Sequence, residues 1–124
     1  LINFFSETDR NLFEDPTGDD LALSDYGLIA LNSVGALLAR YNLNDGKGSP
    51  IEITGHSPKG ENDPWGMSAR QSALVFKEIL KSGVQESQVV KIIGAGDTVL
   101  MDAEKPADEK NRRFEILIRT KPEE

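Results

Sequence analysis

Three blocks of sequence decide the fold, and they follow one another as Ile53-Thr54-Gly55-His56-Ser57-Pro58, Trp65-Gly66-Met67-Ser68-Ala69-Arg70-Gln71 and Asn111-Arg112-Arg113-Phe114-Glu115-Ile116. The first block ends an alternating run, residues 51–54, which predicts a strand closed by a glycine. The second block predicts the first turns of a helix. The third predicts the opening of a last strand, residues 113–119, in which every second side chain faces inward.

The predicted elements around these blocks complete a simple order. We expect a strand at residues 1–5, a helix from an N-cap at Ser24 to about Tyr41, and a strand at residues 89–93 closed by Gly94-Ala95-Gly96. The first helix has apolar or small residues at steps of three and four, which predict one buried stripe: Leu28, Leu31, Gly35, Leu38 and Tyr41. The inward side of the last strand is predicted as Phe114, Ile116 and Ile118.

The second helix has two candidate starts. Asp63 followed by Pro64 favours the first, because proline lacks the N–H group that a first helical turn leaves unpaired, and Ser68 is the alternative cap. Gly83 is the expected stop. Turn-forming or polar residues predict loops at 14–20, 42–50, 56–66 and 102–111.

This order of strand, helix, strand, helix, strand, strand predicts an α/β fold with two layers, a sheet of about four strands and helices packed on one face. At 124 residues the chain is long enough for one domain with a real core. We expect a single domain over 1–124, with an N-terminal strand and acidic loop in 1–20 and the core in 21–120. Since the chain begins at Leu1 rather than Met, we also expect it to be a piece of a longer protein.

Composition excludes several classes of function. The net charge of −7 argues against a nucleic-acid partner, because phosphate binding requires a basic face. The absence of cysteine excludes disulfides and thiolate metal sites. No apolar run approaches the roughly 18 residues of a membrane span.

Catalysis has little support in the sequence. His56 is the single histidine, and we expect it to hydrogen-bond its own loop rather than act as a base or a metal ligand. Gly94-Ala95-Gly96 follows a strand, as a phosphate loop would, but neither a third glycine nor a Lys-Ser/Thr pair follows. We therefore expect no enzyme activity, no metal and no cofactor.

The three blocks resemble the cell-wall-binding domain shared by OmpA, the peptidoglycan-associated lipoprotein and the flagellar stator protein MotB. That family has a strand ending in Gly-His/Tyr-Thr-Asp, a helix opening Leu-Ser-x-x-Arg-Ala and a strand opening Asn-Arg-Arg-x-Glu-Ile. The Trp65-Gly66-Met67-Ser68 junction, and Leu12-Phe13-Glu14 ahead of a polar turn, are most similar to MotB. The resemblance extends from about Leu12 to Ile118 and implies an OmpA-like sandwich with a mixed sheet.

The resemblance also implies a ligand and its site. Family members bind peptidoglycan peptides, commonly through the zwitterionic end of diaminopimelate, with an aspartate for the ammonium and an arginine for the carboxylate. Here Ser57 takes the place of the threonine, while Pro58 and Gln71 stand where that aspartate and arginine belong. The matching site residues are thus Ser57, Pro58, Gln71 and Arg112.

Four further residues are candidates to replace the missing charges. Glu61 and Asp63 lie in the same loop and could supply a carboxylate, and Arg70 or Arg113 could supply a guanidinium. Arg70 points about 100° around the helix from Gln71, so we expect it to face solvent. Arg112 and Arg113 are neighbours on a strand, so at most one can face the site and the other would pair on the surface. Trp65 either covers the start of the helix or forms a lip of the groove.

The function implied by the resemblance is a non-covalent wall anchor: the periplasmic domain of a MotB-like stator subunit, held at the inner membrane by upstream sequence. Its expected partners are peptidoglycan, a second copy of the chain and a MotA-like membrane protein. Two alternatives remain open. One is the wall anchor of an outer-membrane OmpA-type or lipoprotein-type protein, and the other is a domain that has lost peptidoglycan and binds protein.

Overall fold

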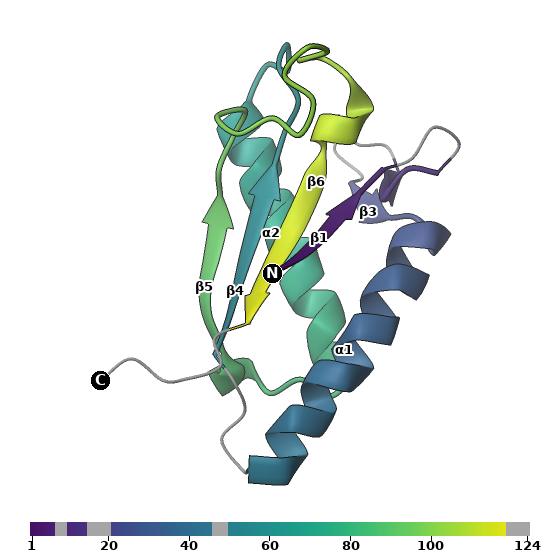
Figure 1. The fold of residues 1–124 in the computed structure, drawn as a ribbon, viewed down its shortest axis with the longest axis vertical. Helices are drawn as coiled ribbons and strands as arrows, with labels where there is room; N and C mark the ends of the chain where they lie inside the picture. The colour runs from purple at the N-terminus through teal and green to yellow at the C-terminus, as the bar shows by residue number, and fades with distance from the viewer. Residues whose placement is uncertain (7–9, 15–20, 46–49, 119–124) are drawn as a thin grey trace.

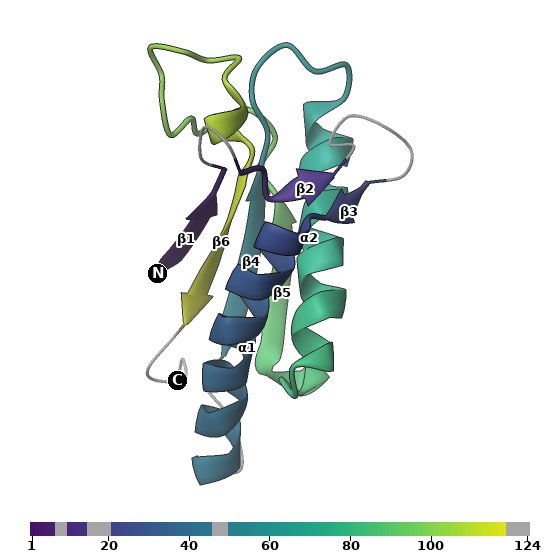
Figure 2. The same cartoon turned by 90° about the vertical axis from the view of Figure 1, so that its right-hand side faces the viewer.

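The computed structural model describes residues 1–6, 10–14, 21–45 and 50–118, with the backbone alone for 41–45. Its main sheet has four strands in the order β1-β6-β4-β5: β1 (Ile2–Phe5), β6 (Arg113–Ile118), β4 (Ile51–His56) and β5 (Val89–Gly94). β4 and β5 are parallel, and β6 is antiparallel to both β1 and β4. The helices α1 (Asp25–Asp45) and α2 (Pro64–Lys81) cover one face of this sheet (Figures 1 and 2). The expected two-layer α/β architecture with a mixed sheet is therefore confirmed.

Four short elements were not predicted. β2 (Phe13–Glu14) and β3 (Ala22–Leu23) form a separate two-stranded sheet, and 3-10 helices occupy Glu86–Gln88 and Glu109–Asn111. Glu14, expected in a loop, lies in β2, while residues 15–20 of that expected loop are outside the described residues. The predicted loop at 56–66 is also shorter than expected, because β4 extends through His56 and α2 begins at Pro64.

The start of α1 follows the prediction. The hydroxyl oxygen of Ser24 accepts a hydrogen bond from the N–H of Gly27 at 3.0 Å, which is the interaction expected of an N-cap serine. The helix continues to Asp45, past the predicted end. Of its predicted stripe, Leu31, Gly35 and Leu38 are buried and Leu28 is half-buried, while the side chain of Tyr41 lies outside the described part of the chain.

The core lies between the helices and the strands they cover. Ile53, Phe114 and Ile116 are fully buried in the sheet, and Val75 and Ile79 of α2 pack against them. The predicted inward side of β6 is confirmed, with Ile118 partly buried at the margin of this cluster. Two aromatic contacts extend the core toward the N-terminus: Phe4 stacks on Phe114 at 4.5 Å between ring centroids, and Phe13 meets the same ring edge-on at 6.1 Å.

The start and stop of α2 also follow the sequence. Asp63 is the N-cap, and its Oδ1 accepts a hydrogen bond from the N–H of Gly66 at 3.0 Å. The alternative cap, Ser68, is instead buried one turn further along the helix. After Lys81 the chain turns at Gly83, whose φ of +103° is the left-handed conformation that glycine adopts readily.

The carboxyl ends of β4 and β5 press closely against the start of α2. A Cβ atom on Gly55 would lie 2.4 Å from the carbonyl oxygen of Ser68, and one on Gly94 would lie 2.7 Å from the amide nitrogen of Ala69. The hydroxyl oxygen of Ser68 accepts a hydrogen bond from the N–H of Gly96 at 2.9 Å. Only glycines permit this approach, which fixes the ends of β4 and β5 relative to the helix.

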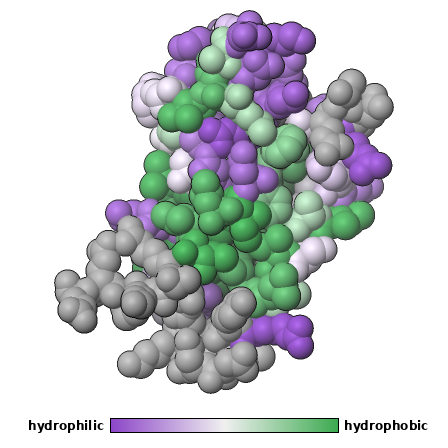
Figure 3. All heavy atoms as spheres, viewed as in Figure 1, coloured by the Kyte–Doolittle hydropathy of each residue, from purple (hydrophilic) through white to green (hydrophobic). Residues whose placement is uncertain are grey.

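The face of the sheet without helices carries apolar side chains, which Figure 3 shows gathered over the middle of the molecule. Ile93 of β5 and Leu117 of β6 are exposed, and their register with Thr54 and Glu52 places them on the side opposite the buried Ile53. Neither helix, over its described residues, has the length and apolar character needed to cross a membrane.

Candidate functional site

The site residues implied by the resemblance meet at the carboxyl end of β4, but they are enclosed. Ser57 and Pro58 directly follow β4, and both are buried. The hydroxyl of Ser57 donates to the carbonyl oxygen of Pro64 at 3.2 Å, which ties the loop to the first residue of α2. The backbone N–H of Ser57 donates to the carbonyl oxygen of Gly96 at 2.8 Å. Both hydrogen-bond donors of Ser57 are thus used within the protein.

Arg112 is a buried cation with carboxylate partners from its own chain. Its side chain is 1% exposed, and its Nη2 donates to Oε1 of Glu61 in a short contact. Its Nε donates to Oε2 of Glu109 at 3.0 Å, and its Nη2 also reaches Oε1 of Glu109 at 3.1 Å. Burial lowers the pKa of Arg112 to about 10, so the guanidinium is still charged at neutral pH. The N–H groups with which Arg112 could bind a ligand carboxylate are therefore already bound to Glu61 and Glu109.

Gln71 belongs to the same buried cluster as Arg112. It is fully buried, and the hydrogen-bonding groups around it fix its amide so that Oε1 accepts from Nη1 of Arg112 at 2.9 Å. In the same orientation its nitrogen donates to the carbonyl oxygen of His56 at 3.1 Å. An arginine at position 71 would place a second cation against Arg112, whereas the neutral amide satisfies it. The negative charge beside Arg112 comes from Glu61 and Glu109 rather than from position 58.

Glu109 is the member of this cluster that the sequence analysis missed. Asn111 positions it by organising the preceding loop: its amide donates to the carbonyl oxygen of Lys105 at 2.9 Å and accepts from the N–H of Asp102 at 2.8 Å. Burial, and secondarily the nearby charge of Asp108, raises the pKa of Glu109. The sequence signal that could have indicated Glu109 is its spacing of three residues from Arg112, because this spacing places the two side chains on the same side of a helical turn.

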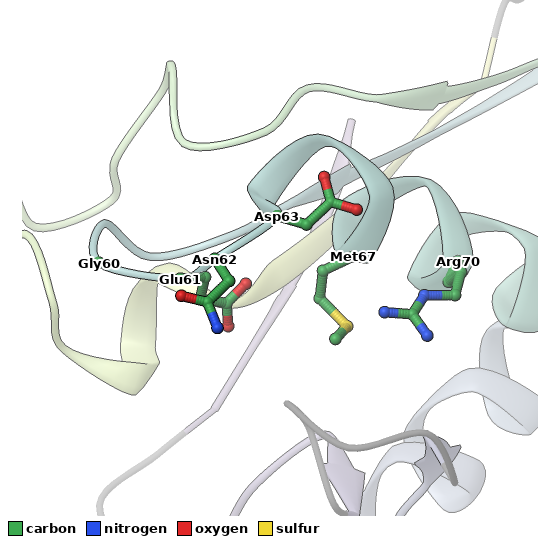
Figure 4. Close-up of a pocket in the computed structure, with 6 residues that line it drawn as sticks. All are labelled: Gly60, Glu61, Asn62, Asp63, Met67 and Arg70. Atoms are coloured by element: carbon green, nitrogen blue, oxygen red, sulfur yellow. The ribbon is translucent and has the colours of Figure 1, made fainter.

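Three of the candidates, Glu61, Asp63 and Arg70, line a pocket beside the Arg112 cluster, which Figure 4 shows. This cavity of about 270 Å³ is bordered by Gly60, Glu61, Asn62, Asp63, Met67 and Arg70. Glu61 and Asn62 lie at one end, the guanidinium of Arg70 lies toward the other, and Met67 lies between them. Arg70 is exposed, as expected, and Asp63 remains engaged as the cap of α2. The fold therefore brings Glu61, Asp63 and Arg70 to the border of one pocket, and Glu61 also contacts Arg112.

Arg113 points to a different part of the molecule. Its Nη1 contacts Glu115 and donates to Oδ1 of Asn3 at 3.1 Å, and its Nη2 donates to the carbonyl oxygen of Val99 at 3.4 Å. The expectation that the two neighbouring arginines diverge is thus met. The expectation that the second one pairs on the surface is wrong, because Arg113 is buried beside the strands.

His56 joins the Arg113 group rather than its own loop, contrary to the expectation from the sequence. Its Nε2 lies 2.9 Å from Oε1 of Glu115 on the neighbouring strand. Burial lowers the pKa of His56, the charge of Arg113 lowers it further, and Glu115 acts in the opposite direction. The imidazole is therefore neutral at pH 7. No set of three His, Asp or Glu side chains in the described ranges is placed to hold a metal ion.

Trp65 covers the turn after β5. A Cβ atom on Gly96 would lie 2.9 Å from the indole ring, so the ring rests against this glycine while 56% of the residue stays exposed. It is not among the residues that border the pocket. This contact lies on the turn after β5, so the two expectations, a cover over the helix start or a lip of the groove, stay predictions.

Comparison with known sequences finds distant relatives. No family model matches the chain. Over 82 residues, or 62% of the chain, it is 28% identical to LafU of Escherichia coli O44:H18 strain 042, a protein named for flagellar export or assembly. It is 27% identical over the same length to a truncated LafU of E. coli K12. The match spans 27% of the first relative and 39% of the second.

Comparison with solved structures identifies the fold. The C-terminal domain of Helicobacter pylori MotB superposes with a TM-score of 0.69 at 19% identity, covering 98% of this chain and 88% of that one. The OmpA-like domain of Francisella tularensis FopA1 gives 0.66 at 17% identity, covering 77% and 62% of the two chains. The peptidoglycan-associated lipoprotein of Burkholderia pseudomallei gives 0.59 at 14% identity, covering 96% and 91%. The chain therefore has the OmpA-like fold, as expected.

Proposed function

We propose that this OmpA-like domain is a non-catalytic tether that holds a MotB-like stator subunit to peptidoglycan. Its place would be the periplasm, and a membrane anchor and a MotA-like partner would be engaged by sequence beyond this domain. Support comes from the likeness to MotB over nearly the whole chain and from relatives named for flagellar assembly. A second copy of the chain would pair with it, so that one motor unit has two attachments to the wall.

The observation that carries this proposal is the mixed charge of the pocket beside Arg112. A wall peptide that contains diaminopimelate offers an ammonium and a carboxylate on one carbon, at the free end of that residue's side chain. The pocket offers a carboxylate from Glu61 and a guanidinium from Arg70, at the end of the sheet where the resemblance places such a ligand. These are the two charges that a zwitterion requires, supplied from positions other than 58 and 71.

Co-sedimentation with purified peptidoglycan sacculi tests the proposal. The 124-residue chain should appear in the pellet in proportion to the sacculi added, and free wall peptides should release it. A chain that stays in the supernatant at every amount of sacculi would refute the tether.

The enclosed Arg112 favours one alternative, a domain that keeps the fold but binds protein instead of peptidoglycan. Its guanidinium is held by Glu61 and Glu109, so in this arrangement it cannot receive a ligand carboxylate. The same sedimentation experiment separates the two functions, since a protein-binding domain has no reason to follow the sacculi.

A further inference from the structure

We propose that the ligand site has moved by one helical position, so that a zwitterionic amino-acid end binds in the pocket between Glu61 and Arg70 while Arg112 serves as a structural cation. The pocket is the set Gly60, Glu61, Asn62, Asp63, Met67 and Arg70. The inference rests on the proposed function for the source of the ligand. The ligand class follows from the chemistry of the pocket.

The carboxylate end of the pocket suits an ammonium group. Oε1 of Glu61 accepts a hydrogen bond from Nη2 of Arg112, whereas Oε2 has no hydrogen-bond partner among the described residues. A carboxylate oxygen removed from water without a partner is unfavourable, and a donor brought by a ligand relieves that penalty. Glu61 and Glu109 together also supply two negative charges against the single positive charge of Arg112. The cluster therefore has a negative charge in excess when both are ionised.

The opposite end suits a carboxylate. Arg70 is exposed and has no ion-pair partner among the residues that the structure describes, so its five donors are available. Its planar guanidinium can hold a carboxylate through two parallel hydrogen bonds. Figure 4 shows the guanidinium extending toward Met67, with Glu61 and Asn62 beyond it. The thioether of Met67 would contact the aliphatic chain that carries this zwitterionic end.

Size and access are consistent with one amino-acid end. Pockets for drug-sized ligands measure about 300–1,000 Å³, and this one measures about 270 Å³. Binding here leaves the ion pairs of Arg112 intact. Binding at Arg112 would require the ligand to displace two glutamates from a side chain that is 1% exposed.

Titration calorimetry of the 124-residue chain with free diaminopimelate tests the inference. We expect saturable one-site binding of diaminopimelate. Pimelate, which lacks the ammonium groups, and 1,5-diaminopentane, which lacks the carboxylates, should each bind at least tenfold more weakly. Absence of diaminopimelate binding, or equal binding of the three compounds, would overturn the proposal.

Two pairs of variants locate the site. Arg70→Gln should weaken binding about tenfold or more, while Arg40→Gln, which removes an exposed arginine from α1, should not change it. Glu61→Gln should weaken binding to a similar extent. Glu109→Gln also takes a carboxylate from Arg112 but lies outside the pocket, so it should leave the affinity within about twofold of the parent. Equal losses in Glu61→Gln and Glu109→Gln would place the ligand at Arg112 and refute the inference.

Sedimentation of the same variants with sacculi separates this inference from the proposed function. If the parent and Arg70→Gln both follow the sacculi equally, the chain is a tether but the pocket is not its site. If diaminopimelate binds through Arg70 yet the parent stays in the supernatant, the pocket assignment holds and the tether fails.

Discussion

Replacing Arg112 with methionine should destabilise the fold by about 3 kcal/mol, because it leaves buried carboxylate without its counterion. Methionine fills much of the same volume, so the loss measures charge and hydrogen bonding rather than a cavity. Removing one partner of a buried ion pair typically costs about 3–5 kcal/mol. Glu61 is only 11% exposed and bears the full effect, whereas Glu109 is 42% exposed and can regain water. We therefore expect the lower end of that range.

Urea unfolding followed by circular dichroism measures this cost. Since unfolding free energy falls by about 1–3 kcal/mol per molar urea in small proteins, the midpoint should drop by 1 M or more. The double variant Arg112→Met/Glu61→Gln should be more stable than Arg112→Met alone, because it removes the uncompensated charge. Arg70→Gln, at an exposed position, should stay within about 0.5 kcal/mol of the parent. An unchanged midpoint for Arg112→Met would refute the structural role of Arg112.

Three further predictions concern the packing around the site. Gly55→Ala should lower the free energy of unfolding by about 1–3 kcal/mol, because its methyl group would lie 2.4 Å from the carbonyl oxygen of Ser68. The loss should appear as a lower urea midpoint, and parent-like stability would contradict the close approach of β4 and α2. Ser68→Ala should cost about 1–3 kcal/mol by leaving the N–H of Gly96 without its acceptor, and that amide should exchange with deuterium faster than in the parent. Burial and the charge of Arg113 lower the pKa of His56, so as the pH falls the imidazole takes up a proton in the unfolded chain before it does in the folded one. The free energy of unfolding should therefore fall as the pH drops below about 6.5, by at most about 1.4 kcal/mol per pH unit. His56→Gln should flatten this dependence between pH 7.5 and 5.5, and an equally steep decline in parent and variant would assign it to other groups.

The secondary structure was largely predictable because it depends on local patterns. Alternation identified β4 and β6, and the Asp63-Pro64 pair identified the start of α2. The small sheet of β2 and β3 was not predictable, because two-residue strands carry no periodicity. Its pairing depends on contacts with the rest of the fold.

The buried cluster around Arg112 could be predicted only in part, and its arrangement could not be predicted. The resemblance pointed to Arg112 and Gln71, yet the sequence could not show that they bind each other. That contact depends on how a strand, a helix and a 3-10 turn meet in space. Glu109 was missed for the same reason, since Pro106 indicated only an irregular segment. The pocket at Arg70 likewise depends on how the loop after β4 folds back to α2.

A crystal structure of the chain with a diaminopimelate-containing wall peptide tests the relocated site most directly. We predict that the free end of the diaminopimelate side chain lies between Glu61 and Arg70, with its carboxylate on Arg70. Glu61 and Glu109 should both remain paired to Arg112. A peptide carboxylate bound to Arg112, with Glu61 displaced into solvent, would contradict the account.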